Sequence, residues 1–373
     1  MSIFLSAGEA SGDHYTANLA ANLRSNGFKG ELWGMGGVEA RSSGMKLEWE
    51  GDRLQLLGLT EVLAAIPSIY SLLNEMTARI IEREPEAVVV CDSPDYHMRL
   101  IARLRAKGYK GRIFYLSPPT VWAWRSSRAD DLRDWDVECL PLFEFEHKFL
   151  LNRGCKSHWL GHPLLEEFRA EANKPPLLAG RFDRERTVAF LPGSRRSEIH
   201  ALLPMMQEAS QVLAERGWQP VFSVAPGLNP TVRENMIEKF ENKSIPYYDG
   251  PGHNLMAVSR CAVGASGTIT VESLLLDCFM VVTYRLNPLS ALAARFLIKT
   301  PYFAMANILA GCELFPELMQ GRATRENIVR STLAWLEDGT CQEDTIKKMN
   351  EARLMLGSAG VYDFWSRIIT EAA

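Results

Sequence analysis

Hydrophobic and polar positions alternate in blocks along the chain, with apolar runs of strand length between amphipathic segments of helix length. In the first half these blocks predict strands and helices in turn. The strands are residues 2–6, 31–33, 87–91, 112–116 and 137–140, and the helices are 13–26, 60–82, 95–107 and 143–153. Strands that alternate with helices form βαβ units, so we expect an α/β protein with a parallel sheet.

The same alternation begins again after residue 185. Further strands are predicted within 187–194, 219–227, 261–268 and 278–285, and further helices over 198–216, 230–241, 253–259 and 268–276, with two or three more in 325–373. The segment 161–187 between the halves is rich in proline, glycine and charged residues. This composition is typical of a domain linker.

The two halves predict two Rossmann-like, doubly wound domains. We place them at residues 1–163 and 164–345, and we expect 346–373 to form helices that pack on the N-terminal domain or on a partner chain. Ligands of doubly wound sheets bind beyond the carboxyl ends of the strands. Two such domains would therefore face each other across a ligand-binding cleft.

Composition excludes several other classes. The chain has 373 residues, of which 47% are hydrophobic and 23% charged, and a net charge of −4; these values argue against a nucleic-acid partner bound through bulk positive charge. Its seven cysteines include no C-x-x-C pair, so neither a zinc site nor a disulfide framework is expected. No export signal precedes the first strand, and the uncharged run 62–74 is too short to cross a bilayer, so we expect a cytoplasmic protein.

One glycine-rich turn in the second half has the layout of a phosphate site. A strand ends at Leu191 and is followed by Pro192, Gly193, Ser194 and Arg195, close to a helix start. Backbone N–H groups at a helix start bind phosphate, and an arginine adds a bidentate contact. A solvated arginine after a turn fits this stretch equally well.

A second turn of small residues follows the strand 261–265. Ser266, Gly267 and Thr268 open a helix that contains Glu272. Small residues let a diphosphate approach the helix end, and a carboxylate one turn further accepts hydrogen bonds from ribose hydroxyls. An ordinary helix cap with an exposed glutamate is the alternative, but the pairing of the two turns favours a nucleotide-diphosphate site.

In the N-terminal half, the apolar strand 87–91 delivers two aspartates to the edge of the sheet. Asp92 directly follows the strand and is placed to act as a general base that takes a proton from an attacking hydroxyl. For Asp95, a helix cap is as good an explanation as a functional position at the edge of the cleft. His97 could take the proton instead, but it falls inside the next helix and is expected to be structural.

Two further stretches suit an amphiphilic ligand. After the strand 112–116 come Trp122, Trp124, Arg125 and Arg128, a composition that suits a sugar face, an acyl chain or a phosphate, with a buried aromatic cluster as the alternative for one tryptophan. The segment 56–83 is unusually apolar for surface helices. A core or dimer interface explains it, and so does a patch that enters a membrane interface and receives a lipid substrate.

The motifs together resemble one family. They are SAGEASGD (6–13), CDSPDY (91–96), VWAWR (121–125), GHPL (161–164), LPGSR (191–195), ASGTITVE (265–272) and NILAGCELFPELMQ (307–320). In this order they are similar to the motifs of the lipid-A-disaccharide synthases, which are inverting glycosyltransferases of the GT-B fold. The resemblance covers nearly the whole chain.

The resemblance implies a reaction and its setting. A diacylglucosaminyl unit leaves UDP and joins diacylglucosamine 1-phosphate (lipid X) through a β(1→6) bond, which gives lipid A disaccharide 1-phosphate and UDP. No cofactor or metal is implied. The family also implies peripheral association with the inner membrane of Gram-negative bacteria, and a homodimer with exchanged C-terminal portions.

The resemblance also implies residue roles. Asp92 matches the catalytic base, and Ser11 lies near the reacting centre. Arg195 neutralises the leaving diphosphate, and Glu272 binds ribose. The implied UDP site comprises Gly193, Ser194, Arg195, Ser266, Gly267, Thr268, Glu272 and, from a neighbouring chain, Asn307; the implied acceptor site comprises Gly12, Asp95, Trp122, Trp124 and Arg125.

Two other functions stay open on the sequence. A UDP-N-acetylglucosamine 2-epimerase on the same fold would bind UDP through similar turns, and a non-catalytic lipid-binding module would keep the fold without the reaction. The VWAWR stretch and the apolar segment 56–83 favour a lipid acceptor over the epimerase. The module would leave Asp92, Arg195 and Glu272 without a role.

Overall fold

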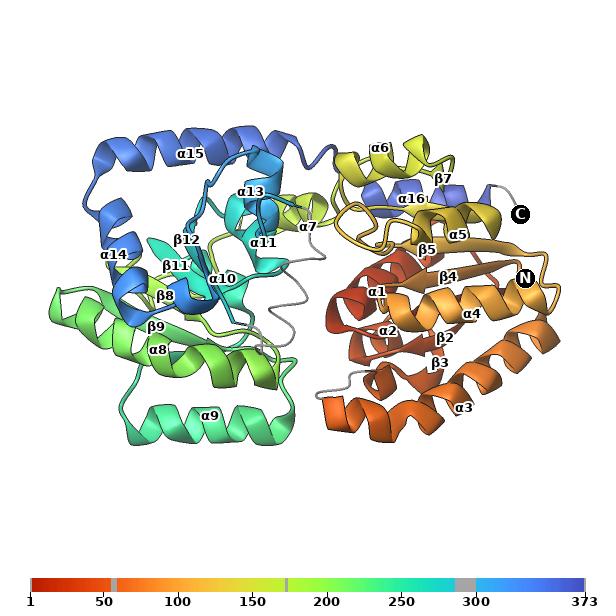
Figure 1. Ribbon diagram of the computed structural model, residues 1–373, viewed down its shortest axis with the longest axis horizontal. Coiled ribbons are helices and arrows are strands. Elements are labelled where there is room, and N and C mark those ends of the chain that lie inside the picture. The colour runs from red at the N-terminus through yellow and green to blue at the C-terminus, as the bar shows by residue number, and fades with distance from the viewer. Residues whose placement is uncertain (1, 55–58, 172–173, 286–299, 372–373) are drawn as a thin grey trace. The chain divides into compact units, whose positions relative to one another are not determined.

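A computed structural model describes residues 2–54, 59–171, 174–285 and 300–371 (Figure 1). The chain divides into two units. Unit 1 comprises Met1–Glu167 with Leu356–Ala373, and unit 2 comprises Phe168–Met355. Each unit has one β-sheet and its own hydrophobic core.

Unit 1 contains a seven-stranded sheet in the order β3-β2-β1-β4-β5-β6-β7. Its strands are β1 Ser2–Ala7, β2 Glu31–Gly36, β3 Lys46–Glu50, β4 Ala87–Cys91, β5 Arg112–Leu116, β6 Val137–Leu140 and β7 Lys156–Ser157. All neighbouring strands are parallel. The chain runs outward from β1 to β3 and then restarts at β4 in the other direction, so the topological switch point lies between β1 and β4.

Helices cover both faces of this sheet, as buried parallel strands require. They are α1 Ala10–Ser25, α2 Val38–Ser42, α3 Leu59–Arg83, α4 Pro94–Ala106, α5 Arg128–Asp134, α6 Glu144–Asn152 and α16 Val361–Thr370, with a 3-10 turn at Gly51–Leu54; α7 Leu164–Glu171 crosses the boundary between the units. The last of these, α16, buries Trp365 and Ile369 and packs against α1. The Ser366 hydroxyl also donates to the Asn22 side chain at 2.7 Å. Unit 1 is thus completed by a helix that follows unit 2 in the sequence.

Unit 2 contains a six-stranded parallel sheet in the order β10-β9-β8-β11-β12-β13. Its strands are β8 Thr187–Leu191, β9 Gln219–Val224, β10 Tyr247–Asp249, β11 Cys261–Ala265, β12 Phe279–Tyr284 and β13 Glu317–Met319. The same outward-and-return order places the switch point between β8 and β11.

The helices of unit 2 alternate with its strands. They are α8 Arg196–Glu215, α9 Pro230–Asn242, α10 Gly252–Met256, α11 Ile269–Leu275, α13 Met305–Ala310, α14 Arg325–Leu336 and α15 Gly339–Leu354, with a 3-10 turn at Gln320–Arg322. The core between them includes Phe190, Phe222 and Phe240, none of which is exposed.

The predicted fold class is confirmed, because both sheets are parallel and doubly wound. Every strand predicted from the sequence is present, within a few residues of its expected bounds. Four strands were not predicted: β3, β7, β10 and β13. These four are the two edges of each sheet. The predicted apolar segment 56–83 begins outside the described residues, and α3 accounts for the rest of it.

Candidate active site

The carboxylate of Asp92 lies against the turn that follows β1. The backbone N–H groups of Gly8 and Glu9 donate to its Oδ1 and Oδ2, each at 3.2 Å, and the Ser93 hydroxyl donates to Oδ1 at 2.6 Å. Because β1 and β4 are neighbours, this contact joins two strand ends at the switch point of unit 1. The structure therefore brings the SAGEASGD and CDSPDY motifs together around one carboxylate.

Oδ2 is the Asp92 oxygen with room for a further partner. A carboxylate oxygen accepts about two hydrogen bonds. Within the described part of the chain, Oδ1 accepts from Gly8 and Ser93, whereas Oδ2 accepts only from Glu9. Gly12 lies beside this oxygen, since a Cβ at position 12 would stand 1.8 Å from Oδ2. Ser11, one residue earlier in the first turn of α1, is exposed.

The backbone at Asp92 is held in an unusual conformation. Asp92 and Ser93 have φ of 52° and 42°, in the left-handed region that costs a non-glycine residue roughly 1–3 kcal/mol. The carbonyl of Asp92 accepts hydrogen bonds from His97 Nδ1 and from the Tyr115 hydroxyl, each at 2.8 Å. Because a carbonyl oxygen only accepts hydrogen bonds, the proton of the neutral His97 ring is on Nδ1. His97 Nε2 therefore accepts a hydrogen bond from the Ser6 hydroxyl at 2.9 Å. His97 is therefore a positioning residue, in keeping with its predicted structural character.

Burial sets the protonation of this site. It raises the pKa of Asp92 to about 7, and the carboxylate of Glu9 adds to the rise, against hydrogen bonds that lower it. Burial also lowers the pKa of His97 to about 4, so this imidazole is neutral at physiological pH. A general base works best when its pKa lies near the working pH. Asp92 meets this condition.

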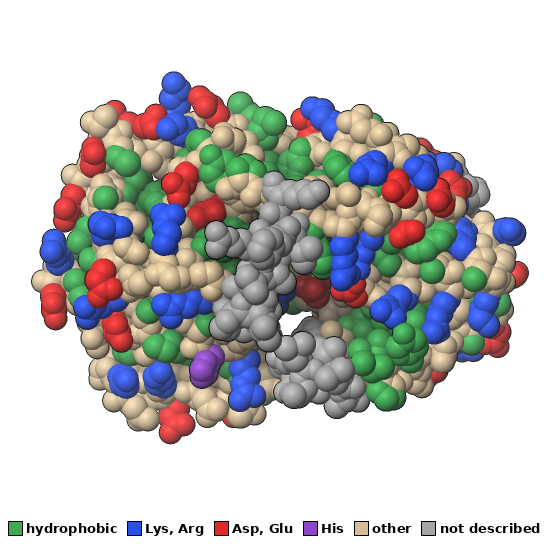
Figure 2. All heavy atoms as spheres, in the orientation of Figure 1, with side chains coloured by type: hydrophobic (Ala, Val, Ile, Leu, Met, Phe, Trp, Pro, Cys, Tyr) green, Lys and Arg blue, Asp and Glu red, His purple; other side chains and the backbone are tan. Residues whose placement is uncertain are grey.

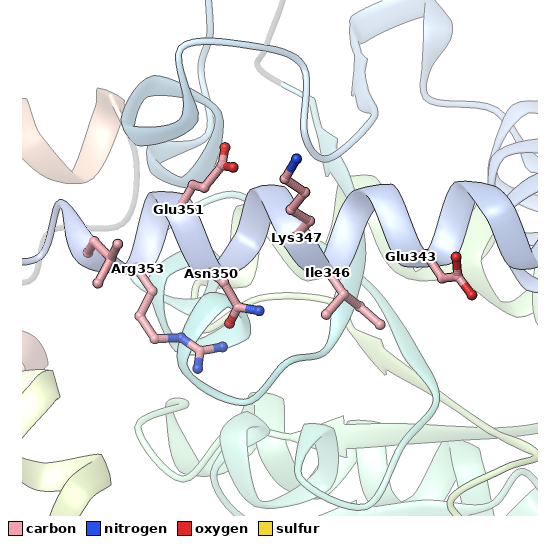
Figure 3. Close-up of a pocket in the computed structure, with 7 residues that line it drawn as sticks. Glu343, Ile346, Lys347, Asn350, Glu351 and Arg353 are labelled. Atoms are coloured by element: carbon pink, nitrogen blue, oxygen red, sulfur yellow. The ribbon is translucent and has the colours of Figure 1, made fainter.

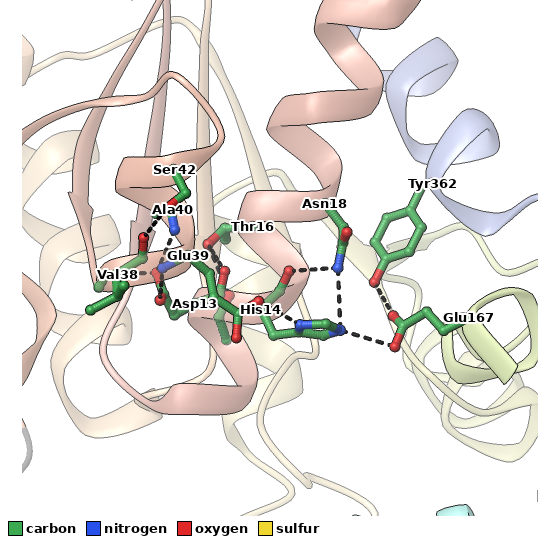
Figure 4. A network of polar contacts seen from close by, with 12 residues as sticks. Asp13, His14, Thr16, Asn18, Val38, Glu39, Ala40, Ser42, Glu167 and Tyr362 are labelled. Atoms are coloured by element: carbon green, nitrogen blue, oxygen red, sulfur yellow. Dashed lines mark hydrogen bonds and ion pairs between the residues drawn. The ribbon is translucent and has the colours of Figure 1, made fainter. Parts of the chain in front are cut away.

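Asp13 connects the opening turn to α2. Its buried carboxylate accepts the backbone N–H groups of Gly37 at 2.5 Å, Glu39 at 3.0 Å and Ala40 at 3.3 Å (Figure 4). These donors belong to the start of α2 and are left unpaired by the helix itself. Asp13 therefore has a structural role, as a cap supplied by another helix.

His14, the residue after Asp13 in α1, lies between two carboxylates. Its Nδ1 is 2.7 Å from Glu39 Oε2 and its Nε2 is 2.9 Å from Glu167 Oε2 (Figure 4). The hydrogen bond with Glu167, reinforced by Glu39, raises the pKa of His14 to about 9. Glu167 also accepts the Tyr362 hydroxyl of α16 at 2.6 Å. His14 is thus a cation that is paired with two carboxylates, one at each ring nitrogen.

The VWAWR stretch splits into two parts. Trp122 Nε1 donates to Glu146 Oε1 at 2.8 Å, and its ring packs edge-on against Phe145 at 4.8 Å. The alternative of an aromatic packing cluster therefore applies to Trp122, whose polar group already has a partner. The guanidinium of Arg125 lies 4.3 Å from the ring centre of Trp124, so only the second tryptophan lies with the cations.

Asp95 joins this second part and does not cap a helix. It lies in the first turn of α4, its side chain is 70% exposed, and its Oδ1 is 3.1 Å from Arg125 Nη1 and also pairs with Arg128. The helix cap position belongs to Ser93. The structure thus groups the predicted acceptor residues Asp95, Trp124 and Arg125, and adds Arg128.

In unit 2, Arg195 stands at the start of α8 and is paired within its own turn. Glu198 Oε2 accepts the backbone N–H of Ser194 at 3.1 Å and of Arg195 at 3.3 Å, and Glu198 Oε1 is 3.3 Å from Arg195 Nη1. Gly193, with φ of 112°, packs against this carboxylate, since a Cβ there would stand 2.4 Å from Glu198 Oε2. The two backbone donors expected to meet phosphate therefore hold a carboxylate in this conformation.

A hollow of about 790 Å³ opens beside Arg195. It is lined by Arg195, Ser197, Glu198, His200, Ala201, Pro204, Met205, Glu208, Tyr284, Arg285, Thr324, Arg325 and Glu326. The lining comes from α8, the end of β12 and the start of α14. Its three arginines are matched by three glutamates, Glu198, Glu208 and Glu326, so the charge of the lining does not by itself select an anionic ligand. The second predicted turn and Glu272 are not part of this lining.

The second turn nevertheless lies at the same switch point. Ser266, Gly267 and Thr268 follow β11, which is the parallel neighbour of β8. A Cβ at Gly267 would meet none of the described atoms within 4 Å, so the described residues leave space at this glycine. Glu272 follows in α11 with a side chain 16% exposed, and its Oε2 is 3.7 Å from His253 Nδ1.

Asn307 is placed differently from the expectation. It is fully buried, its Nδ2 donates to the Phe315 carbonyl at 2.8 Å and to Glu317 Oε1 at 2.9 Å, and its Oδ1 accepts the Phe315 N–H at 2.8 Å. Its amide thus joins α13 to β13. These contacts use both hydrogens of the Asn307 amide and one acceptor position of its oxygen, so a nucleotide contact stays a prediction that would have to use the remaining position or replace one of these bonds.

Other features of the described residues do not contribute to this site. A hollow of about 650 Å³ runs along α15, lined by Glu343, Ile346, Lys347, Asn350, Glu351, Arg353 and Leu354 (Figure 3). All of these side chains come from one helix and include none of the predicted site residues. In the described parts of the chain, no three histidine, cysteine or acidic side chains lie together in a way that could hold a metal ion, and no helix there has the length and apolar character to cross a membrane.

The sequence matches the profile of the lipid-A-disaccharide synthetase family over residues 3–360. The chain belongs to the lipid-A-disaccharide synthase family. It is 33% identical over 370 residues to the lipid-A-disaccharide synthase of Myxococcus xanthus, covering 96% of this chain and 94% of that protein. It is 35% identical over 343 residues to the synthase of Azotobacter vinelandii, covering 90% of each.

Solved structures show how widely this fold occurs. A UDP-N-acetylglucosamine 2-epimerase from Neisseria meningitidis, bound to UDP-N-acetylglucosamine, superposes with a TM-score of 0.63 over 100% of this chain and 99% of that one, at 13% identity. At this identity the likeness concerns the fold alone. The GT-B architecture expected for a lipid-A-disaccharide synthase is confirmed.

Several residues that contact the candidate site residues of this lipid-A-disaccharide synthase family member were not predicted from the sequence. Glu198 follows Arg195 by three positions, which is the spacing of a helix capping box and could have been read from the sequence. Ser6 and Tyr115 have no such local signal. They reach Asp92 and His97 only because β1, β4 and β5 are neighbours in the sheet.

Proposed function

We propose that this lipid-A-disaccharide synthase family member transfers a 2,3-diacylglucosaminyl group from UDP to the 6-hydroxyl of 2,3-diacylglucosamine 1-phosphate. The products are the β(1→6)-linked disaccharide 1-phosphate and UDP. The observation that carries the proposal is the Asp92 carboxylate, held at a switch point by the family's first motif. Its pKa of about 7 suits proton abstraction from a hydroxyl.

The proposed step is a single displacement with inversion. The acceptor 6-hydroxyl loses its proton to Asp92 Oδ2 while its oxygen attacks C1 of the donor sugar. The bond between C1 and the UDP oxygen breaks, and its electron pair leaves with UDP. Ser11, exposed next to Gly12, is proposed to contact the sugar at this centre.

The leaving diphosphate is proposed to bind unit 2. Arg195 supplies a cation at the start of α8, and the open turn Ser266–Thr268 supplies backbone donors. Because Glu198 occupies the N–H groups of Ser194 and Arg195, the diphosphate either displaces this carboxylate or uses the guanidinium alone. Glu272 is proposed to accept the ribose hydroxyls.

These roles assign one substrate to each part of the chain. We propose that the acceptor binds residues 1–163 and the UDP-sugar binds residues 164–345. Residues 346–373 include α16, whose packing on α1 supports a role in the acceptor-binding part. A homodimer remains a proposal, which analytical ultracentrifugation of the purified protein would test.

Peripheral association with the cytoplasmic face of the inner membrane is proposed to involve α3. Ile66 and Tyr70 are 40% and 41% exposed, and Figure 2 shows hydrophobic side chains gathered over this helix. Arg99 donates to the Tyr70 hydroxyl at 2.7 Å, and the Arg103 guanidinium lies 5.5 Å from the Tyr70 ring. Apolar side chains beside arginines suit an anionic lipid surface.

Vesicle binding tests this surface. Ile66→Ser and Tyr70→Ser should reduce co-sedimentation with vesicles that contain phosphatidylglycerol. Leu177→Ser is the matched control, because Leu177 is an apolar side chain in unit 2 that is 75% exposed. Equal binding by all three variants would contradict a role for α3.

The reaction itself is tested with the purified protein and both lipid substrates. Mass spectrometry should detect the disaccharide 1-phosphate together with UDP in equal amounts. Incubation with UDP-N-acetylglucosamine alone should yield no manno epimer. Formation of the epimer without the disaccharide would instead establish the epimerase alternative. If neither product forms, the result favours the lipid-binding module.

A further inference from the structure

A pair of arginines forms a cationic corner after β5. Arg125 and Arg128 both face Oδ1 of Asp95, and both guanidinium groups lie over the ring of Trp124, with their central carbons 4.3 Å and 5.8 Å from its centre. Arg125 has φ of 47°, so its backbone is held in the left-handed region. Arg125 Nη1 and Arg128 Nη2 each donate one hydrogen bond to this oxygen, a charge-assisted contact that arginines also make to a phosphate oxygen.

The charges of this corner do not balance. Two guanidinium groups share one carboxylate, which leaves one net positive charge among Arg125, Arg128 and Asp95. Asp95 is 70% exposed, whereas Arg128 is only 14% exposed. A poorly solvated arginine paired with a solvated carboxylate is well suited to exchange that carboxylate for an anionic ligand.

The corner is close to the proposed base. Asp92 follows β4 and the corner follows β5, and these strands are parallel neighbours. The Asp92 N–H donates to the Leu116 carbonyl at 3.4 Å. The Tyr115 hydroxyl donates a hydrogen bond to the Asp92 carbonyl. Burial raises the pKa of Tyr115, and the positive charge of Arg128 is near enough to oppose this rise.

His14 is another cation near the opening turn, and it does not offer the same chemistry. Glu39 and Glu167 already flank both of its ring nitrogens. Its single charge faces two carboxylates, so an incoming anion would be repelled. The arginine pair therefore carries a net positive charge that can bind an anion, whereas His14 with its two carboxylates does not.

We propose that Arg125 and Arg128 bind the 1-phosphate of the glucosamine acceptor, with Asp95 Oδ1 holding the two guanidinium groups together until the phosphate arrives. This inference rests on the proposed function. In a pyranose, C1 and the carbon that carries C6 are both bonded to the ring oxygen, so the phosphate and the attacking hydroxyl lie on the same edge of the sugar. An acceptor with its 6-hydroxyl at Asp92 therefore presents its phosphate to a neighbouring loop.

The test compares two acceptors, diacylglucosamine with and without its 1-phosphate, at saturating donor. The wild-type protein should prefer the phosphorylated acceptor in kcat/KM by about 10- to 100-fold, the usual worth of charged hydrogen bonds. Arg125→Ala and Arg128→Ala should bring this ratio close to one by raising KM for the phosphorylated acceptor only. Arg128→Lys, which keeps the charge and loses the fork, should give an intermediate ratio.

Arg133→Ala is the matched control. It lies on α5 with Arg128 and pairs with Asp130 and Asp134 of the same helix, so its loss should leave the ratio unchanged. Titration calorimetry of the Asp92→Asn protein with each acceptor in detergent micelles gives the same comparison of affinities without turnover. That measurement decides the inference even if the proposed reaction fails.

A ratio that stays at the wild-type value in both alanine variants overturns the inference. So does an equal loss of kcat/KM for the two acceptors, which would mean that the corner orients the sugar. Binding to phosphatidylglycerol vesicles separates a lipid headgroup site from an acceptor site. The variants should bind vesicles as the wild type does, and a selective loss of vesicle binding with an unchanged ratio would also refute the proposal.

Discussion

The amide of Gly8 and the carboxylate of Asp92 are joined by a hydrogen bond of 3.2 Å across 84 positions of sequence. Gly8 directly follows β1 and Asp92 directly follows β4, and the doubly wound order makes these two strands neighbours. The opening turn therefore does not need to bind phosphate to be functional. It holds the carboxylate that we propose as the general base.

Replacement of Asp92 by asparagine should abolish most of the transfer. Asparagine keeps the size of the side chain but does not accept a proton, and loss of a general base typically costs about 10²- to 10⁴-fold in rate. UDP release measured with both lipid substrates checks this, with the UDP dissociation constant as a measure of intact unit 2. Asp134→Asn, an exposed carboxylate on α5, is the control. Turnover of Asp92→Asn at the wild-type rate would show that the proton goes elsewhere.

The pH dependence of kcat/KM should follow Asp92. Burial raises the pKa of this carboxyl to about 7, and only the deprotonated form accepts a proton. Activity should therefore be low at pH 5, rise through pH 7 and level off above pH 8. A profile that is flat between pH 5 and 8 would exclude Asp92 as the titrating base.

Substitution of Gly12 by alanine should impair catalysis more than folding. The new methyl group would overlap Asp92 Oδ2, and a displacement of about 1 Å at a reacting group costs about 100-fold in rate. We expect kcat to fall by about that factor. Gly227→Ala is the control, because a Cβ at Gly227 meets none of the described atoms within 4 Å. If both variants retain full kcat, Oδ2 is not the reacting oxygen.

Removal of the Tyr115 hydroxyl should loosen the strained backbone at Asp92. Tyr115→Phe loses the hydrogen bond to the Asp92 carbonyl, which contributes about 1 kcal/mol to stability. The free energy of unfolding in urea should drop by about that amount, and kcat should fall without a change in KM for the donor. A stability loss with unchanged kcat would confine Tyr115 to packing.

Loss of the Arg195 guanidinium should weaken stabilisation of the departing UDP. Arg195→Ala should lower kcat by about 10²- to 10³-fold, as removal of a group that stabilises transition-state charge does. Arg216→Ala, at the other end of α8, should retain normal turnover. Near-normal turnover of Arg195→Ala would assign the diphosphate to other residues of unit 2.

The hydrophobic pattern predicts the interior of both sheets and fails at their edges. Interior strands such as β4 are buried along their whole length and read as apolar runs. The missed strand β3, KLEWE, is charged and partly exposed, and β7 has two residues. Edge strands are short and polar because an exposed apolar edge would pair with other chains. Their signal in the sequence is weak for this physical reason.

The candidate site shows the same division between local and distant information. Turns after strands identify Asp92, Arg195 and Ser266 from the sequence alone. The burial that raises the pKa of Asp92 depends on its neighbours in the sheet, and so does the internal pairing that occupies Asn307. Contacts between segments far apart in sequence cannot be read from the spacing within either segment.

The place of α16 has a consequence for biosynthesis. This helix packs on α1 of the first unit, although all of Phe168–Met355 is translated between the two. At about 5–20 residues per second, the ribosome needs roughly 10–40 s for that stretch. During this interval the nascent first unit lacks its closing helix, so the unit that starts first is the one that matures last.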